Sequence, residues 1–459
     1  MLDKLPEDIF YTLYSYLPIE DAARAACVSH GFLRSWRRYP RLLFNNKTLA
    51  LEDTQYKEDK IASHFVNQIN HVIENHSRFG IKVLILQLYP CRYIHASYID
   101  KWLQIAVKHG IDELALEMSI LEKRAEYNFP SFLLSNEKGG ATLESLRLTS
   151  CAFHPTTTLG CNRSLTSLYL SFVHITGEEL GQFVSNCTAL VRLLLYNCND
   201  IICFKVPTML HHLNYFHVTQ CKMLQVIEIR APNLSRFDYG NGRIQISLGS
   251  EVKHIRIIGP NTLCYAHAEL PSFMPSVQRL IVESTCEVCA MFIPFRYLDI
   301  SVVDVQQLYY GLDYFCLFSF LEGSPALETF MLRVGTGNLL RRDSVLRDLE
   351  KDQLHLRQMP DCLHHNLKNV TIIGFTSAKS LIELTSHIVR NASALACMTL
   401  DTARGCGRRT ANVDRCQRMS EKGLLEAQKA LEAVKRCIEG IVPSSINLKA
   451  LEPCGQCGC

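Results

Sequence analysis

The sequence predicts an α/β fold with three short N-terminal helices, a solenoid built on a parallel sheet, and a C-terminal capping helix. One short pattern, apolar-x-x-apolar-x-apolar, recurs between residues 81 and 400, and its internal alternation is typical of a strand. The leucines that open it recur at the roughly 20–29 residues of a solenoid repeat. A chain of 459 residues with 47% hydrophobic residues can bury the long core that such an array needs.

Charge and hydropathy narrow the functional classes. The formal net charge of +3 is too small for a polycationic protein, so nucleic acid is not an expected partner. Apolar runs such as KVLILQLY fall well short of the roughly 20 residues that a bilayer requires, and the N-terminus shows no secretory signal. We therefore expect no membrane partner and a cytoplasmic and/or nuclear location. In a reducing compartment the 20 cysteines act as small buried hydrophobes.

Residues 1–45 are predicted to form three short helices. Pro6 suits the first turn of the first helix, Pro18 interrupts it, and Ser29 can cap the third. Three helices of this size bury too little surface to be stable alone, because domains under about 40 residues usually need a metal, a disulfide or a partner. The sequence therefore predicts a segment that another polypeptide completes, with an ordinary N-terminal cap on the following domain as the alternative.

The same segment resembles the F-box family. The match runs through LPEDIFYTLYSYLP, EDAARAACVS, FLRSW and YPRLLF, which follow the family's two Leu-Pro pairs, its Asp-Ala-x-Arg-Ala segment, its Val-Ser and its aromatic positions. The resemblance implies a three-helix F-box that binds a Skp-family adaptor and, through it, a cullin. The residues that it places at or behind the adaptor surface are Leu5, Pro6, Ile9, Leu13, Leu17, Pro18, Ile19, Ala22, Val28, Ser29, Phe32, Leu33 and Trp36.

The segment departs from the family pattern at His30-Gly31-Phe32, where basic residues and Trp are more common. Gly31 lowers helix propensity and Phe32 fills less volume, so we expect weaker adaptor binding. The arginines of this segment form a solvated helix face or, as the alternative, a nucleic-acid patch. They are Arg34, Arg37, Arg38 and Arg41.

Residues 46–80 are expected to form a helical linker and the N-terminal cap of the solenoid, and residues 81–401 the solenoid itself. The strand motif runs from IKVLIL, IDELAL, LESLRL, LTSLYL and LVRLLL through LNYFHV, LQVIEI, LSRFDY, VKHIRI and VQRLIV to FRYLDI, LETFML, LKNVTI and LACMTL. Each coil adds one strand whose Leu side chains point inward, as in leucine-rich repeats. Cys151 and Cys198 follow two of these motifs, where a small side chain can satisfy backbone groups in the turn that leaves the strand.

Irregular spacing modifies this scheme in the middle of the array. Leu213, Leu224 and Leu234 are about half a coil apart, which predicts strands that alternate between the inner and outer sides of a coil with no room for a helix. Helices are expected on the outer side at residues 176–186 and within residues 305–323.

Residues 402–459 are expected to contain a basic loop, the capping helix and a cysteine-containing tail. Ser420 begins a helix with an apolar stripe, and Gly440 is expected to end it. The tail offers Cys454, Cys457 and Cys459, too few for a zinc site by themselves, so no metal or cofactor is expected; chelation together with one distant Cys or His is the alternative. The basic loop is interpreted as mobile and solvated, with nuclear import or anion binding as the alternative; its arginines are Arg404, Arg408, Arg409, Arg415 and Arg418.

Catalysis is not expected. The sequence has no nucleophile elbow, phosphate loop, paired-His metal motif or dinucleotide turn in a supporting context. The pairs His211-His212 and His364-His365 each precede a strand, and we expect them at the surface.

The complete chain resembles plant F-box proteins with degenerate leucine-rich repeats. LQVIEIRAPNLSRFDYG and HNLKNVTIIGFTSAKSLIELTSHIVRNASALACMTLD are similar to segments of one large plant subfamily. The resemblance implies a non-catalytic substrate-recognition subunit of an SCF-type ubiquitin ligase that binds a protein substrate through its repeats. Two alternatives stay open: a receptor for a small hormone-like molecule and a scaffold that does not lead to degradation. The sequence does not identify the substrate.

Overall fold

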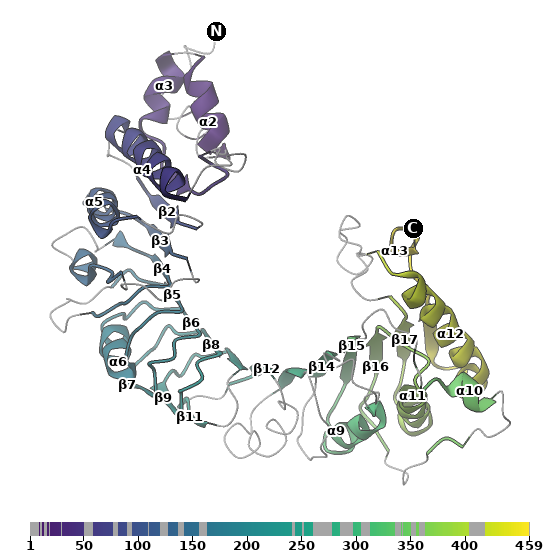
Figure 1. Cartoon of the computed structure of the whole chain (residues 1–459). Helices are drawn as coiled ribbons and strands as arrows, with labels where there is room; N and C mark the ends of the chain where they lie inside the picture. The colour runs from purple at the N-terminus through teal and green to yellow at the C-terminus, as the bar shows by residue number, and fades with distance from the viewer. Residues whose placement is uncertain are drawn as a thin grey trace. The chain divides into compact units, whose positions relative to one another are not determined.

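A computed structural model describes the chain in two compact units (Figure 1). Unit 1 comprises Met1–Leu234 with Ile244–Ser250, and unit 2 comprises Ser235–Arg243 with Glu251–Cys459. Each unit has its own run of parallel strands. The residues that the structure describes are 9, 12, 16–17, 19–28, 30–49, 58–76, 81–89, 94–108, 110–119, 127–135, 142–155, 163–240, 244–249, 252–259, 278–284, 297–303, 313–335, 341, 343–349, 355–357, 363–403 and 418–458.

Unit 1 begins with the predicted helical segment. Helix α2 (Ile19–Ala26) packs against α3 (His30–Trp36), and α4 (Glu58–Asn75) occupies the segment expected to be a helical linker. Of the first predicted helix, the structure describes only a few residues, among them the helical Ile9 and Tyr16. These elements confirm a helical N-terminus ahead of the sheet.

The main sheet of unit 1 is wholly parallel, and each pair of neighbours is in register without interruption. The second and fourth residues of a strand point into the core, as Leu146 and Leu148 do with at most 1% of their surface exposed. Alternation of this kind is why the leucine motif specifies the sheet. The strands in order are β1 (Arg41–Phe44), β2 (Val83–Gln87), β3 (Glu113–Glu117), β4 (Ser145–Thr149), β5 (Ser167–Ser171), β6 (Arg192–Tyr196) and β8 (Tyr215–Thr219).

The first strand lies earlier than the repeat pattern predicts. β1 pairs with β2 in parallel, from Arg41↔Val83 to Phe44↔Leu86, although the motif first recurs at residue 81. The sequence RLLF is too short to carry the whole motif, and its match to the end of the F-box pattern hides it. The sheet therefore starts inside the segment expected to be the F-box, and the domain boundaries after residues 45, 80 and 401 stay predictions.

A second, three-stranded sheet covers the outer side of unit 1. It has the order β11-β9-β7, with β7 (Cys203–Met209), β9 (Val226–Arg230) and β11 (Gln245–Ser247). β8 joins the main sheet, β9 the outer sheet, and the following β10 (Arg236–Gly240) pairs with β12 (His254–Gly259). The predicted alternation of half-coil strands is therefore confirmed. Two helices, α5 (Ala96–Val107) and α6 (Gly177–Ser185), and a 3₁₀ turn at Ser131–Leu134 complete this side.

A left-handed residue ends each of several strands in unit 1. Ser150, Phe172, Asn197 and Gln220 have φ between 51° and 58°, and each directly follows β4, β5, β6 or β8. A left-handed corner turns the chain inward, so that the next residue is buried. Three of these next residues are the cysteines Cys151, Cys198 and Cys221, each with no exposed surface.

The buried cysteines also make the hydrogen bonds expected of them. The Cys198 thiol lies 3.6 Å from the carbonyl oxygens of Leu170 and Tyr196, and the Cys221 thiol lies 3.7 Å from that of Thr219. Small thiols therefore fill the corner and satisfy backbone groups there, which confirms the expected role of the cysteines that follow the strands.

Unit 2 continues the same architecture with a wholly parallel run of strands. After β10 and β12 come β13 (Arg279–Ser284), β14 (Tyr297–Val303), β15 (Thr329–Gly335), β16 (Asn369–Ile373), β17 (Cys397–Asp401) and β18 (Asn447–Leu451). The helical side is formed by η5 (Tyr314–Leu317), α9 (Phe318–Glu322), α10 (Val345–Leu349), α11 (Lys379–Asn391), α12 (Glu421–Cys437), η8 (Glu439–Ile441) and α13 (Gly455–Gly458). Figure 1 places α9 and α11 on the same side of the strands.

The predicted C-terminal helix is present as α12. The Ser420 hydroxyl accepts a hydrogen bond from the Gly423 amide at 3.2 Å, as an N-cap should. The helix ends at Cys437, and Gly440 lies in the 3₁₀ turn that follows it. Because β18 comes after this helix, α12 connects two neighbouring strands, and β18 is the last strand of the sheet.

Of the other predicted helices and loops, some are confirmed and some lie outside the described residues. The helix at 176–186 is confirmed by α6, whereas within 305–323 the described helical residues are only the short η5 and α9. Most of the basic loop, including Arg404, Arg408, Arg409 and Arg415, falls outside the described residues, as does Cys459. None of the helices among the described residues combines the length and apolar character needed to cross a bilayer.

The expectation that His364 lies at the surface is wrong. Its side chain is buried, and its ring packs 5.8 Å from the ring of His387. Its backbone amide donates a hydrogen bond to the Asn391 carbonyl at 2.8 Å, which fixes this position against the end of α11. The other three histidines of the two pairs, His211, His212 and His365, are exposed as expected.

Candidate functional site

The N-terminal helical surface exposes large apolar side chains. Ile9 is 42% exposed, Tyr16 84% and Val28 75%. A contiguous exposed apolar patch is typical of a surface that another protein covers, and these three residues belong to the segment that resembles the F-box. Ile9 and Val28 were both predicted at the adaptor surface, and Tyr16 adds an aromatic side chain that the prediction missed.

The other predicted adaptor residues lie at different depths. Ala22 is fully buried between the helices, so it supports the surface from behind, and Ile19 lies in α2. Leu17, Phe32, Leu33 and Trp36 are half-buried. Leu5, Pro6, Leu13, Pro18 and Ser29 lie outside the described residues.

Tyr39 anchors this surface to the rest of unit 1. It is 2% exposed, its hydroxyl donates to the Leu17 carbonyl at 2.7 Å, and its ring lies 5.6 Å from the ring of Trp36. From the other side, His76 Nε2 lies 2.9 Å from the Tyr39 carbonyl oxygen. Burial raises the pKa of Tyr39, so its hydroxyl stays a donor at neutral pH. Sequence reasoning missed this residue, although it stands in the matched YPRLLF.

The main sheet of unit 1 presents a second candidate surface, which we call its open face: the side chains that alternate with the buried leucines. A polar ladder crosses β1–β5 on it. Asn45 donates to Gln87 at 2.8 Å, and Gln87 donates to Glu117 at 2.9 Å. Arg147 reaches Glu117 at 3.5 Å and lies 5.5 Å from the ring of Tyr169.

Aromatic side chains continue this surface beyond the polar ladder. The rings of Phe172 and Tyr196 meet edge to face at 5.4 Å, and those of Tyr215 and His217 at 6.3 Å. Phe172 has the left-handed φ of 51° described above, which costs an aromatic residue backbone strain. Tyr and Arg are the side chains that protein interfaces enrich, so the open face suits a protein ligand.

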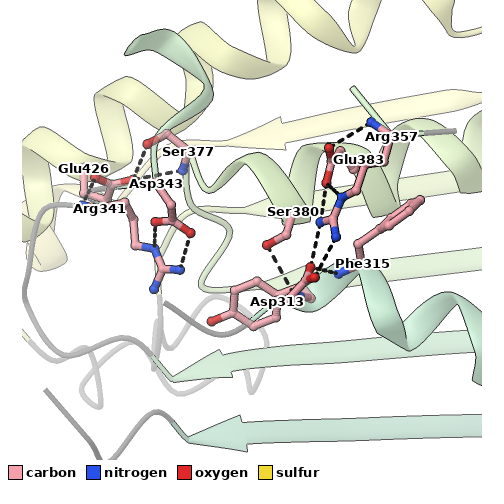
Figure 2. A network of polar contacts seen from close by, with 10 residues as sticks. Asp313, Phe315, Arg341, Asp343, Arg357, Ser377, Ser380, Glu383 and Glu426 are labelled. Atoms are coloured by element: carbon pink, nitrogen blue, oxygen red, sulfur yellow. Dashed lines mark hydrogen bonds and ion pairs between the residues drawn. The ribbon is translucent and has the colours of Figure 1, made fainter. Parts of the chain in front are cut away.

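Unit 2 contains a network of charged side chains around buried carboxylates on its helical side (Figure 2). Arg357 donates to both carboxylate oxygens of Asp313 at 2.7 Å and, through Nε, to Glu383 at 2.7 Å. The Glu383 carboxylate has no exposed surface, and Arg357 stacks 4.7 Å from the ring of Phe315. The two carboxylates raise the pKa of Arg357, and Arg357 lowers the pKa of Asp313.

A second buried carboxylate extends the network toward α12. Glu426 accepts hydrogen bonds from the Ser377 amide at 2.9 Å, from the Ser377 hydroxyl at 2.7 Å and from the Arg341 amide at 2.9 Å. Arg341 pairs with Asp343 through two bonds of 2.9 and 2.8 Å. Figure 2 shows these side chains converging from segments far apart in the sequence. These bonds join segments of the same unit that are up to 85 residues apart in the sequence, so they hold the helical side together.

No metal-binding constellation occurs among the residues that the structure describes, since no three His, Cys, Asp or Glu side chains come together there. Cys454 and Cys457 place their sulfurs 3.4 Å apart.

Comparisons with known proteins agree with this architecture. Residues 72–455 match the model of a leucine-rich-repeat domain family described as At1g61320/AtMIF1. The chain is 21% identical over 427 residues to the F-box/FBD/LRR-repeat protein At2g04230 of Arabidopsis thaliana, which covers 88% of this chain and 89% of that protein. It is also 21% identical over 409 residues to the putative F-box/FBD/LRR-repeat protein At5g56810 of the same plant, covering 86% and 88%.

Other relatives are matched over a shorter length. The chain is 24% identical over 217 residues to the F-box/FBD/LRR-repeat protein At3g52680 of Arabidopsis thaliana, with 45% of this chain and 44% of that protein covered. The chain thus spans about half the length of this relative and 52% of the putative F-box/LRR-repeat protein At5g02930.

Proposed function

The chain belongs to the leucine-rich-repeat domain family described as At1g61320/AtMIF1 and is a plant F-box/leucine-rich-repeat protein; from this premise we propose that it is the substrate-recognition subunit of an SCF-type ubiquitin ligase. In this role residues 1–45 bind a Skp-family adaptor, which links the chain to a cullin. The repeats bind the protein to be modified. The complex would act in the cytoplasm or the nucleus.

The observation that carries the proposal is the exposed apolar surface of the N-terminal helices. Val28 and Tyr16 expose most of their side chains to water, whereas the sheet behind them has a complete core. Tyr39 holds this surface in place without covering it, through its bond to the Leu17 carbonyl. A surface that is fixed in position and left uncovered supports binding to a separate adaptor.

The proposed mechanism is proximity, without chemistry by this chain. The adaptor surface and the open face lie on different elements, so one molecule can hold the adaptor and a client together. Holding two reactants together raises their effective concentration, and well-oriented reactants gain a large part of their rate advantage in this way. A client lysine kept near the ubiquitin-charged enzyme would react in preference to lysines free in solution.

A pair of point variants tests adaptor binding. Removal of residues 1–45 would also remove β1 and uncover the edge of β2, so a truncation confuses loss of the surface with loss of the fold. We therefore compare Val28→Asp with Ile202→Asp, because Ile202 is a similarly apolar side chain, 52% exposed, far along unit 1. Binding of a purified Skp-family adaptor is measured by titration calorimetry.

The expected result is at least a tenfold loss of adaptor affinity in Val28→Asp and unchanged affinity in Ile202→Asp, because a carboxylate cannot be buried unpaired in an apolar contact. Equal affinity in both variants, or no adaptor binding by the unmodified chain, would overturn the proposed function.

A further inference from the structure

We propose that unit 2 binds an acidic peptide segment of the client through a row of basic side chains at the amino-terminal ends of β10, β12 and β13. The inference rests on the proposed function and specifies the chemistry of the client. The basic row consists of Arg236, Lys253, His254 and Arg279.

Strand register brings the basic row together. Arg236 is paired with His254, and His254 with Arg279, at the first position of three neighbouring strands. Parallel strands lie about 4.8 Å apart, so the three positions span about 10 Å. Lys253 immediately precedes His254 in the chain. Residues separated by more than 40 positions in the sequence therefore form one continuous charged strip.

The side chains of the row point away from the core of unit 2 and are accessible. The next residue of each strand, Phe237, Ile255 or Leu280, is buried with at most 2% exposure, so the first residue points away from the core. Arg236, Lys253, His254 and Arg279 are all exposed. The four side chains of the row therefore lie at the surface of unit 2.

The cations of the row act on His254. Partial burial lowers the pKa of His254, and the charges of Arg279, Arg236 and Lys253 lower it further. Each cation is thus close enough to His254 to disfavour a further positive charge there. An anion placed on the row would relieve this repulsion.

One member of the row is already fixed in position. Arg236 donates to both oxygens of Asp238, at 2.9 Å each, and the Asp238 side chain is 1% exposed. The buried carboxylate holds the guanidinium in one orientation, which reduces the conformational entropy that a ligand must remove on binding. Lys253 and Arg279 supply further positive charge beside it.

The dimensions of the row favour a short anionic peptide over nucleic acid. A strip of about 10 Å matches two or three carboxylates of an extended peptide, or one phosphoserine, because an extended chain advances about 3.3 Å per residue. Nucleic-acid binding depends on about six to ten phosphate contacts along a longer track, and the net charge of the whole chain is only +3.

Fluorescence anisotropy with the full chain tests the proposal. Four labelled probes are compared: a Gly/Ser peptide carrying four Glu, the same peptide with a single phosphoserine, the same peptide with four Lys, and a single-stranded oligonucleotide. We expect the two anionic peptides to bind, with an affinity that falls as salt is raised, and the Lys peptide not to bind. Binding of either anionic peptide supports the proposal, and the tighter one identifies carboxylate or phosphate as the preferred group.

Charge reversal locates the binding. The double variant Lys253→Glu with Arg279→Glu should lower the affinity for the anionic peptides at least tenfold. Arg192→Glu is the matched control, because Arg192 is also an exposed first residue of a strand, but its neighbours in register are Ser167 and Tyr215. The control should keep the affinity of the unmodified chain.

Three results would overturn the inference: unchanged affinity in the double variant, an equal loss in Arg192→Glu, or tighter binding of the oligonucleotide than of either peptide. Circular dichroism melting of each variant confirms that it is folded. Adaptor titration with the same variants separates this inference from the proposed function, because the charge reversals should leave adaptor affinity unchanged even where peptide binding fails.

Discussion

The two units of the chain share one architecture, but the interactions that stabilise the outer side of each unit differ. In unit 1 the outer helix α6 approaches the outer sheet at backbone distance: a Cβ on Gly177 would lie 1.8 Å from the Cys203 carbonyl oxygen, and one on Gly181 2.1 Å from that of Lys205. In unit 2 the corresponding side is connected by Arg357, Glu383 and Glu426 through charge-assisted hydrogen bonds.

The difference shows that the same repeat pattern on the inner side is compatible with different kinds of packing on the outer side of the solenoid. The inner leucines set the sheet in both units, while the outer side is filled by close backbone packing in one and by buried ions in the other. Close packing depends on shape and responds to added volume. Buried ion pairs depend on complete pairing and respond to the loss of one partner.

Added volume in unit 1 gives the largest expected effect. Gly177→Ala should destabilise the chain by about 3 kcal/mol, because the new methyl group meets a backbone carbonyl that cannot rotate away. Urea unfolding followed by hydrogen exchange of peptides from each unit measures the loss and locates it. Gly440→Ala is the control, since nothing lies within 4 Å of a Cβ there. Equal stability of the two variants would contradict the close approach of α6.

Acid should weaken unit 2 through His364. Burial, followed by the charges of His387 and His365, lowers the pKa of His364 from 6.5 to about 4. Between these values the unfolded chain binds a proton that the folded chain does not, so the stabilisation is complete above pH 6.5 and is lost as the pH falls to 4. The loss is at most about 3 kcal/mol.

The His364→Leu variant isolates this contribution. His76 in unit 1 also has a pKa lowered by burial and adds a slope of the same sign, so the comparison of variant with unmodified chain is the informative one. Unfolding midpoints measured from pH 7 to pH 4.5 should change less with pH in the variant. An unchanged slope would show that His364 charges without cost.

Removal of one charged partner in unit 2 gives the next largest expected loss of stability. Arg357→Ala leaves the fully buried Glu383 carboxylate without its cation and should cost about 2 kcal/mol, less than a wholly buried pair because Arg357 itself is 49% exposed. Arg357→Lys retains the charge but not the paired geometry, and it should cost less. Hydrogen exchange of α11 peptides measures both. Protection in α11 that is unaffected by Arg357→Ala would contradict the network.

Loss of a helix cap gives the smallest expected effect, and it can be compared directly between the two units. Thr176 caps α6 and Ser420 caps α12, each through a hydroxyl that accepts a backbone amide at 3.3 or 3.2 Å. Replacement of either by Ala should cost about 1 kcal/mol. Equal losses would show that local helix ends behave alike and that the two units differ only in how their outer sides pack. The measurement is urea unfolding of the two variants in parallel.

Much of the sheet was predictable from the sequence, because an inward leucine pattern is local. Each predicted strand motif, from IKVLIL to LACMTL, overlaps a strand of the structure. The strands that were missed lack the pattern: β1 has only four residues and β11 three, β7 contains Pro207, and β18 follows the helix that was expected to end the fold. The alternating leucine pattern does not reveal a strand that is short or that buries few of its side chains.

The candidate sites were predictable only where a known pattern carried them. Ile9 and Val28 were taken from the apolar F-box positions and are exposed in the structure, and their role in adaptor binding stays a prediction. Tyr39 acts through a bond to Leu17, 22 residues away. Arg357 finds its partners 26 and 44 residues away, and the basic row depends on the register of three strands. Contacts at such distances follow from tertiary structure and have no signature in a short stretch of sequence.

The half-coil strands of unit 1 limit where residues can be inserted into or deleted from this chain. Arg192 and Tyr215 are in register in the main sheet, and Cys203 and Val226 are in register at the start of the outer pair, so both pairs are 23 residues apart before the register of β7 and β9 shifts beyond Lys205. Gain or loss of a single residue between β6 and β9 would turn every following side chain to the wrong face until the shift was corrected. Natural length variants of this protein should therefore spare that stretch, or alter it by one whole coil.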